Sequence, residues 1–104
     1  MRLIISGDGF KVSNKTRRLL DEKLSSVEKK LPNFDEEVKT ADVRIKKGSR
    51  WGMLMSFDMS LPKKKRIFAE VGGEDLLNMA VELAEEVERQ VDKYRHELGI
   101  SDKV

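Results

Sequence analysis

Cysteine is absent from this 104-residue chain. Its absence excludes a disulfide scaffold, a thiol nucleophile and a thiolate metal site, and it is typical of proteins of a reducing cytoplasm. Aromatic residues are also scarce, and no apolar run approaches the roughly 20 residues that a membrane span needs. The first ten residues hold only three consecutive apolar side chains, which does not predict a signal peptide. We therefore expect one domain over residues 1–104, located in the cytoplasm and without a membrane partner.

Residues suited to catalysis are few. The single histidine, His96, falls near the end of a predicted helix, where its positive charge would favour the helix dipole. The same helix carries carboxylates interleaved with Arg89 and Lys93, which is typical of a solvated face rather than of an acid–base pair or a metal site. These carboxylates are Glu82, Glu85, Glu86, Glu88 and Asp92. We predict a protein that is not an enzyme and that uses no cofactor, no metal and no small-molecule substrate.

Apolar side chains that recur every three or four residues predict two helices. The first stripe lies between Ser13, a candidate N-cap, and the sequence Pro32-Asn33, which would end the helix. Its members are Leu20, Leu24, Val27 and Leu31. The second stripe has Glu74 and Asp75 in its expected first turn and Gly99 as its expected C-cap. Its members are Leu76, Ala80, Leu83, Ala84, Val87, Val91, Tyr94 and Leu98.

Four shorter segments predict strands. "RLIIS" at residues 2–6 is an apolar run that "GDG" would close in a turn. Residues 38–48, 51–61 and 66–72 alternate apolar and polar side chains, which is typical of an antiparallel sheet with one solvated face. The predicted order is β-α-β-β-β-α, an α+β fold. Because only one sheet face is apolar, we expect both helices to pack on that face of a four-stranded sheet, leaving the other to solvent or a ligand.

The net charge of +2 hides an uneven distribution. Residues 39–66 hold 9 Lys and Arg against 2 Asp and Glu, whereas residues 67–104 hold 4 against 10. A basic segment of this kind fits a polyanionic partner, and it fits a solvated hairpin equally well. Its densest part, "LPKKKRIF" at residues 61–68, lies between two predicted strands, which favours a hairpin tip that contacts an RNA backbone, or a soluble loop, over a nuclear address.

Cations suited to phosphate come from four places: the first predicted helix, the second strand, the basic hairpin and the end of the second helix. The candidate RNA-binding residues are Lys15, Arg18, Lys23, Lys29, Lys30, Arg44, Lys46, Lys63, Lys64, Lys65, Arg66, Arg89, Lys93 and Arg95. Only Trp51 and Phe68 are aromatic near the basic stretch, and Trp51 fits the core alternation. Recognition of phosphates and shape is therefore favoured over stacking of bases on aromatic rings.

Residues 73–94, "GEDLLNMAVELAEEVERQVDKY", resemble the second-helix signature of the ribosome hibernation-promoting factors, the family that includes ribosome-associated inhibitor and is often labelled sigma-54 modulation protein. The matching residues are Gly73, Glu74, Asp75, Glu88, Arg89, Gln90 and Lys93. The first helix is similar to the family's as well, at Arg17, Lys23, Leu24, Val27, Glu28 and Lys29. The shared β-α-β-β-β-α order covers essentially the whole chain.

The resemblance implies a fold like a double-stranded-RNA-binding domain with an extra first strand. It also implies binding of ribosomal RNA in the messenger and transfer RNA channel of the small ribosomal subunit, which silences translation under stress. Leu77, Glu86 and Ser26 depart from the family's tyrosine and two lysines. We therefore expect the RNA contacts to shift toward the hairpins, with Arg89, Lys93 and Arg95 as a minor contact.

One alternative has a different basis. The acidic second helix, or the exposed sheet face, could instead make the chain a non-enzymatic protein-interaction or transcription-modulating module. Relatives occur in a short form and in a longer one with a dimerisation domain. The sequence alone leaves open which form this is, whether ribosomes are paired or kept single, and what the oligomeric state is.

Overall fold

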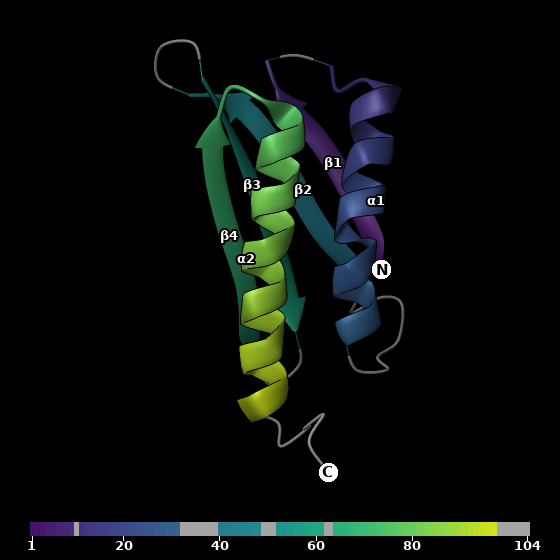
Figure 1. Ribbon diagram of the computed structural model, residues 1–104, viewed down its shortest axis with the longest axis vertical. Helices are drawn as coiled ribbons and strands as arrows, with labels where there is room; N and C mark the ends of the chain where they lie inside the picture. The colour runs from purple at the N-terminus through teal and green to yellow at the C-terminus, as the bar shows by residue number, and fades with distance from the viewer. Residues whose placement is uncertain (10, 32–39, 49–51, 62–63, 98–104) are drawn as a thin grey trace.

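The computed structural model describes residues 1–9, 11–31, 40–48, 52–61 and 64–97 (Figure 1). Its elements follow the predicted β-α-β-β-β-α order and are β1 (Arg2–Asp8), α1 (Asn14–Lys30), β2 (Thr40–Lys47), β3 (Met53–Leu61), β4 (Lys65–Gly73) and α2 (Leu76–Glu97). The α+β fold class is thereby confirmed. Strand β1 runs two residues beyond the predicted "RLIIS", because Gly7 and Asp8 still pair with β2.

The four strands form one sheet in the order β1-β2-β3-β4. The pairs β2–β3 and β3–β4 are antiparallel, as their alternating sequences predict. Strand β1 pairs with β2 in parallel, so the sheet is mixed. Parallel neighbours need a crossover connection, and α1 provides it.

Both helices cover the same face of the sheet, as predicted, with α1 in front of β1 and β2 and with α2 in front of β4 and β3 (Figure 1). They run in the same direction, and both start at the upper end of the view. Two contacts fix their register, Ser26 Oγ to Glu88 and Lys30 Nζ to Asp92, each joining residues 62 apart. None of the described helices combines the length and apolarity needed to cross a bilayer.

The predicted apolar stripes form the core between the sheet and the helices. Leu20, Leu24, Val27 and Leu31 of the first stripe are all buried, and so are Ala41, Val43 and Ile45 of β2. In the second helix Leu76 is half-buried, while Met79, which the predicted stripe omitted, is buried. Met79 lies three residues after Leu76, on the same side of the helix. Among the described residues, the largest fully buried side chain is Phe57 of the inner strand β3.

The helix starts differ in how well they were predicted. Ser13 caps α1 as expected, since its Oγ accepts from the Thr16 N–H at 3.2 Å. Glu74 and Asp75, however, do not lie in the first turn of α2, which begins at Leu76. The Asp75 carboxylate instead accepts from the N–H groups of Leu77 and Asn78, at 2.9 and 3.4 Å. An aspartate just before a helix bonds its free first-turn amides, so Asp75 is the N-cap.

Several expectations fall on residues outside the described ranges. They concern Pro32 and Asn33 as the end of the first helix, Trp51 in the core alternation, Lys63 in the basic hairpin, and Leu98 and Gly99 at the end of the second helix. Helix α1 itself ends at Lys30, with Leu31 as its C-cap.

Both edge strands of the sheet receive a side chain from the helix that lies beside them. At β1, Arg17 Nη1 donates to the Ile5 carbonyl at 3.2 Å. At β4, Gln90 Nε2 donates to the Phe68 carbonyl at 2.7 Å, and the Phe68 N–H donates to Gln90 Oε1 at 3.2 Å. The Gln90 amide thus pairs with β4 as a neighbouring strand would, at an edge that would otherwise expose these backbone groups.

Two substitutions of Gln90 distinguish the hydrogen bond that its amide accepts from Phe68 from the one that it donates to Phe68. In Gln90→Met both are lost, and we expect hydrogen exchange of the Phe68 amide to accelerate about 5- to 10-fold, the value of one typical hydrogen bond. In Gln90→Glu the acceptor remains while the donor is lost, so the Phe68 amide should keep its protection. Exchange measured residue by residue by NMR distinguishes the two. Equal exchange in wild type, Gln90→Met and Gln90→Glu would contradict this role.

Candidate nucleic-acid interface

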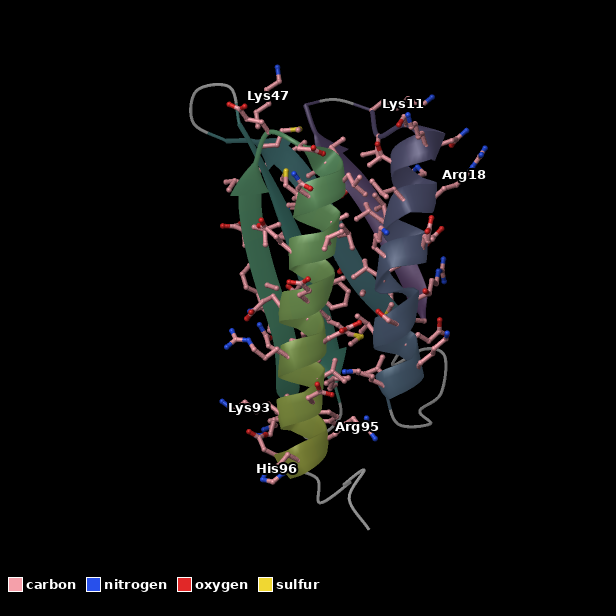
Figure 2. The ribbon with its side chains drawn as sticks, in the orientation of Figure 1. Lys11, Arg18, Lys47, Lys93, Arg95 and His96 are labelled. Carbon is pink, nitrogen blue, oxygen red and sulfur yellow. The ribbon has the colours of Figure 1, made fainter. Side chains whose placement is uncertain are left out.

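Most of the candidate cations lie toward the two ends of an elongated molecule whose extents are 46 × 23 × 23 Å, whereas Lys23, Arg44 and Arg89 lie between them. Figure 2 places Lys11, Arg18 and Lys47 at the upper end, and Lys93, Arg95 and His96 at the lower end. With their neighbours along the elements, they define an upper group of Lys11, Lys15, Arg18, Lys46 and Lys47. The lower group consists of Lys29, Lys30, Lys64, Lys65, Arg66, Lys93 and Arg95.

The upper group surrounds the start of α1 and the end of β2. Within the described residues, none of its five cations forms an ion pair with a carboxylate of this protein. The N-termini of both helices lie at this end and add partial positive charge. Lys11 and Lys47 were missing from the predicted site, although Lys47 follows a predicted candidate directly in "RIKKG" and Lys11 precedes the predicted N-cap.

The lower group is partly neutralised by the protein's own carboxylates. Lys30 Nζ lies 3.1 Å from Asp92, and Lys65 Nζ lies 3.3 Å from Glu97. Arg66 donates two hydrogen bonds to Asp58, at 2.8 and 2.6 Å. The C-termini of both helices also lie here, and their dipoles oppose the positive charge. Lys29, Lys64 and Lys93 form no ion pair with the described residues.

The Arg66–Asp58 pair is the best defined of these contacts. Hydrogen bonds from Arg66 hold the pKa of Asp58 below its ordinary value of 3.8, against the opposing effect of burial. The pair's contribution to stability is therefore present above pH 3.8 and is lost as the pH falls through the lowered pKa. The Arg66 guanidinium also lies 5.1 Å from the centre of the exposed Phe68 ring. Two local partners thus hold the one arginine of the basic hairpin in place.

Helix α2 carries an acidic surface between the two ends. Arg89 binds Glu86 within its own helix, at 2.7 Å, and these hydrogen bonds lower the pKa of Glu86. Glu82 and Glu85 are exposed and form no ion pair with the described residues. Lys23 of α1 is half-buried and also has no carboxylate partner among them. Of the carboxylates expected on a solvated face, Glu82, Glu85 and Asp92 are exposed, while Glu86 and Glu88 are half-buried.

Arg44 and Lys46 lie on the sheet face that the helices leave open, since they alternate with the buried Val43 and Ile45. The same face carries carboxylates on every strand. Asp42 pairs across the sheet with Ile4 and Asp58, and Lys46 pairs with Asp8. Glu70 of β4 completes the set. The open face is therefore mixed in charge, and the predicted cations do not form one continuous surface.

Three features of the described residues concern the groups most often used in catalysis. They contain no cluster of three or more His, Asp or Glu that could hold a metal ion. His96 lies in the last turn of α2, where the sequence placed it. Burial raises the pKa of Tyr94 above its ordinary value of 10.0, against the smaller opposing effect of Lys65.

Comparison with known proteins gives a family and a fold. The model of the family described as "Sigma 54 modulation protein / S30EA ribosomal protein" matches residues 3–98. A ribosomal subunit interface protein from Coxiella burnetii is similar in structure, with a TM-score of 0.75 and 20% identity over 92% of this chain and 99% of that one. The N-terminal domain of Thermus thermophilus Protein Y has a TM-score of 0.75 and 17% identity, over 91% and 100%. No curated protein matches the sequence.

Proposed function

The chain belongs to the Sigma 54 modulation protein / S30EA ribosomal protein family, and from this membership we propose that it is a ribosome hibernation factor. In this proposal it binds ribosomal RNA of the small subunit in the cytoplasm and occludes the channel for messenger and transfer RNA under stress. The observation that carries the proposal is the family match, which extends over all six elements from β1 to α2. The structural relatives add that the whole fold is shared.

The distribution of charge supports RNA as the partner. Neutralisation of phosphates by Lys and Arg supplies most of the affinity of such complexes. Cations that form no ion pair with the described residues can bind phosphate without breaking a contact in that part of the structure, and they are found in both groups, in α1 and in β2. Among the predicted residues they are Lys15, Arg18, Lys23, Lys29, Arg44, Lys46, Lys64 and Lys93.

Four other predicted residues would have to exchange partners. Lys30, Lys65, Arg66 and Arg89 are each bound to a carboxylate of the protein. A phosphate would compete with that carboxylate, so their net gain on binding RNA is smaller. Because the cations lie at both ends of a 46 Å molecule, we expect the domain to bridge two RNA segments rather than to lie with one face on a single helix.

Inhibition requires no reaction. A folded domain about 23 Å thick, held in a channel by phosphate contacts, excludes other RNA by its volume. The proposal therefore assigns no catalytic residue and no cofactor.

Cosedimentation with small ribosomal subunits tests the proposal. We expect the protein to sediment with the subunit in about 0.1 M salt and to dissociate as the salt concentration rises. Each phosphate contact makes the slope of log K against log salt more negative by about 0.7–0.9. Failure to cosediment in low salt would refute ribosome binding. Recovery of a protein partner after removal of the RNA would favour the alternative, an interaction module acting through the exposed Glu82 and Glu85 of α2.

A further inference from the structure

An open groove of about 550 Å³ lies between the N-terminal halves of α1 and α2. Its apolar wall consists of Leu19, Leu76 and Leu77, and its charged lining includes Lys15, Arg18 and Glu22. Leu19 and Leu76 are half-buried and pack against the hydrophobic core, so this wall is fixed by the fold. The volume is within the range of about 300–1,000 Å³ in which proteins bind small organic groups.

Leu77 is the feature that packing does not explain. It is 48% exposed, more than any other large apolar side chain in the described part of the chain. The contacts between α1 and α2 pair residues that are 62 apart in the sequence, and the same offset places Leu77 of α2 beside Lys15 of α1. An apolar and a cationic side chain therefore line the same groove. Neither Lys15 nor Arg18 forms an ion pair with the described residues.

This combination suits a ligand that is anionic at one end and flat and apolar at the other. A nucleotide that has left its base stack has this form. Its phosphate would contact Lys15 and Arg18, and its base would lie on the leucines. The planar guanidinium of Arg18 can also stack on a base, which an ammonium cannot do. Glu22 lies on α1 one turn after Arg18, so it limits the phosphate contacts to the Lys15–Arg18 end of the groove, and it can accept a hydrogen bond from the exocyclic amino group of a base.

We propose that the groove between α1 and α2 binds one unstacked base of a single-stranded RNA segment, with the adjoining phosphates at Lys15 and Arg18. The proposal deepens the proposed function and rests on it for the identity of the RNA. It adds recognition of a base by aliphatic side chains, because the described residues of the groove lining include leucines and no aromatic side chain. Because Glu22 is an acceptor, cytosine should be preferred over uracil, which lacks the amino group.

Two single-stranded RNA hexamers, one of cytidine and one of uridine, are the direct probes. In methyl NMR spectra we expect the methyl signals of Leu19, Leu76 and Leu77 to move upfield, since they would lie over the face of an aromatic base. The cytidine hexamer should bind more tightly, and Glu22→Ala should remove the preference. Leucine signals that stay in place at saturating hexamer would overturn the proposal.

Substitution of Leu77 by serine separates the base contact from the phosphate contacts. We expect Leu77→Ser to weaken binding to the cytidine hexamer and to the small subunit about fivefold, which is the lower end of the range for one stacked base. The slope of log K against log salt should not change, because no phosphate contact is lost. Leu77→Tyr should bind both at least as tightly as wild type, because tyrosine offers the base a larger surface. Ile4→Ser is the matched control, because Ile4 is 46% exposed on the opposite sheet face, and it should bind as wild type.

The outcomes separate this proposal from the proposed function. Equal binding by wild type and Leu77→Ser in both assays would overturn the base site while leaving ribosome binding intact. Loss of subunit binding by Leu77→Ser with normal hexamer binding would overturn it too, and would indicate a ribosomal protein in the groove. A wild-type protein that binds the hexamer with shifted leucine signals but never cosediments with subunits would uphold the base site and refute the ribosomal role.

Discussion

Neutralising Lys15 and Arg18 together, in Lys15→Gln/Arg18→Gln, will weaken binding to the small ribosomal subunit by about 25- to 60-fold in 0.1 M salt. The magnitude follows from two lost phosphate contacts, each contributing about 0.7–0.9 to the slope of log K against log salt. The slope itself should therefore fall by about 1.4–1.8. Both side chains are exposed and without an intramolecular ion pair in the described structure, so the substitutions cost the fold little. Titration of labelled protein with subunits at four or five salt concentrations measures both quantities.

The matched control is Lys65→Gln/Arg66→Gln in the basic hairpin. It removes the same charge, but these two cations already bind Glu97 and Asp58. Their release for RNA frees two carboxylates, so we expect less than about a fivefold loss and a slope change below about 1. An equal or larger effect than that of Lys15→Gln/Arg18→Gln would mean that the lysine-rich hairpin is the main RNA contact, as its sequence suggests, and that its ion pairs open on binding.

Truncation of Phe57 will lower the free energy of unfolding by about 3–5 kcal/mol. Phe57 is fully buried in the central strand β3, with Val43 and Ala69 as its neighbours across the sheet. Domains of this size are stable by about 5–15 kcal/mol in total, so Phe57→Ala removes a large part of what holds the fold together. Urea denaturation followed by circular dichroism gives the difference.

Phe68→Ala provides the comparison within the same residue type. Phe68 lies on the next strand but points to the open face and is 45% exposed. We expect a loss of about 1 kcal/mol, since only about half of its apolar surface is removed from water. If the two variants proved equally destabilised, the assignment of the inner and outer sheet faces would be wrong.

The elements of this fold follow closely from its apolar pattern, because each stripe had only one way to be buried. The period-two segments became β2, β3 and β4, and the stripe of Leu20, Leu24 and Val27 became the buried side of α1. The alternation in β2, β3 and β4 predicted their antiparallel pairing, but the apolar run of β1 shows no such alternation, so its parallel pairing could not be derived from the pattern. The predicted start of α2 was two residues too early, at Glu74 and Asp75, whereas the helix begins at Leu76. An aspartate is common both as an N-cap and in the first turn of a helix, so the sequence alone does not distinguish the two positions.

The candidate site was harder to predict than the fold. The sequence identifies cations, and it does not show which carboxylates will face them. Asp58 and Arg66 meet only because β3 and β4 form a hairpin, and Lys65 meets Glu97 only because α2 returns to the start of β4. The division into two ends has the same origin, since it depends on the directions of α1 and β4 in space. The family resemblance, by contrast, rested on residue order along the chain and is confirmed by the family match.

Because α1 and α2 point the same way, their peptide dipoles add instead of cancelling as they do in an antiparallel pair. Lys11, Lys15, Arg18 and Lys47 reinforce the positive pole, while Glu97, Asp92 and Asp58 weaken the attraction of the other. An anionic group near the helix starts would therefore meet the positive ends of both dipoles together with these cations, while Asp8 and Asp75 at the same end limit that attraction.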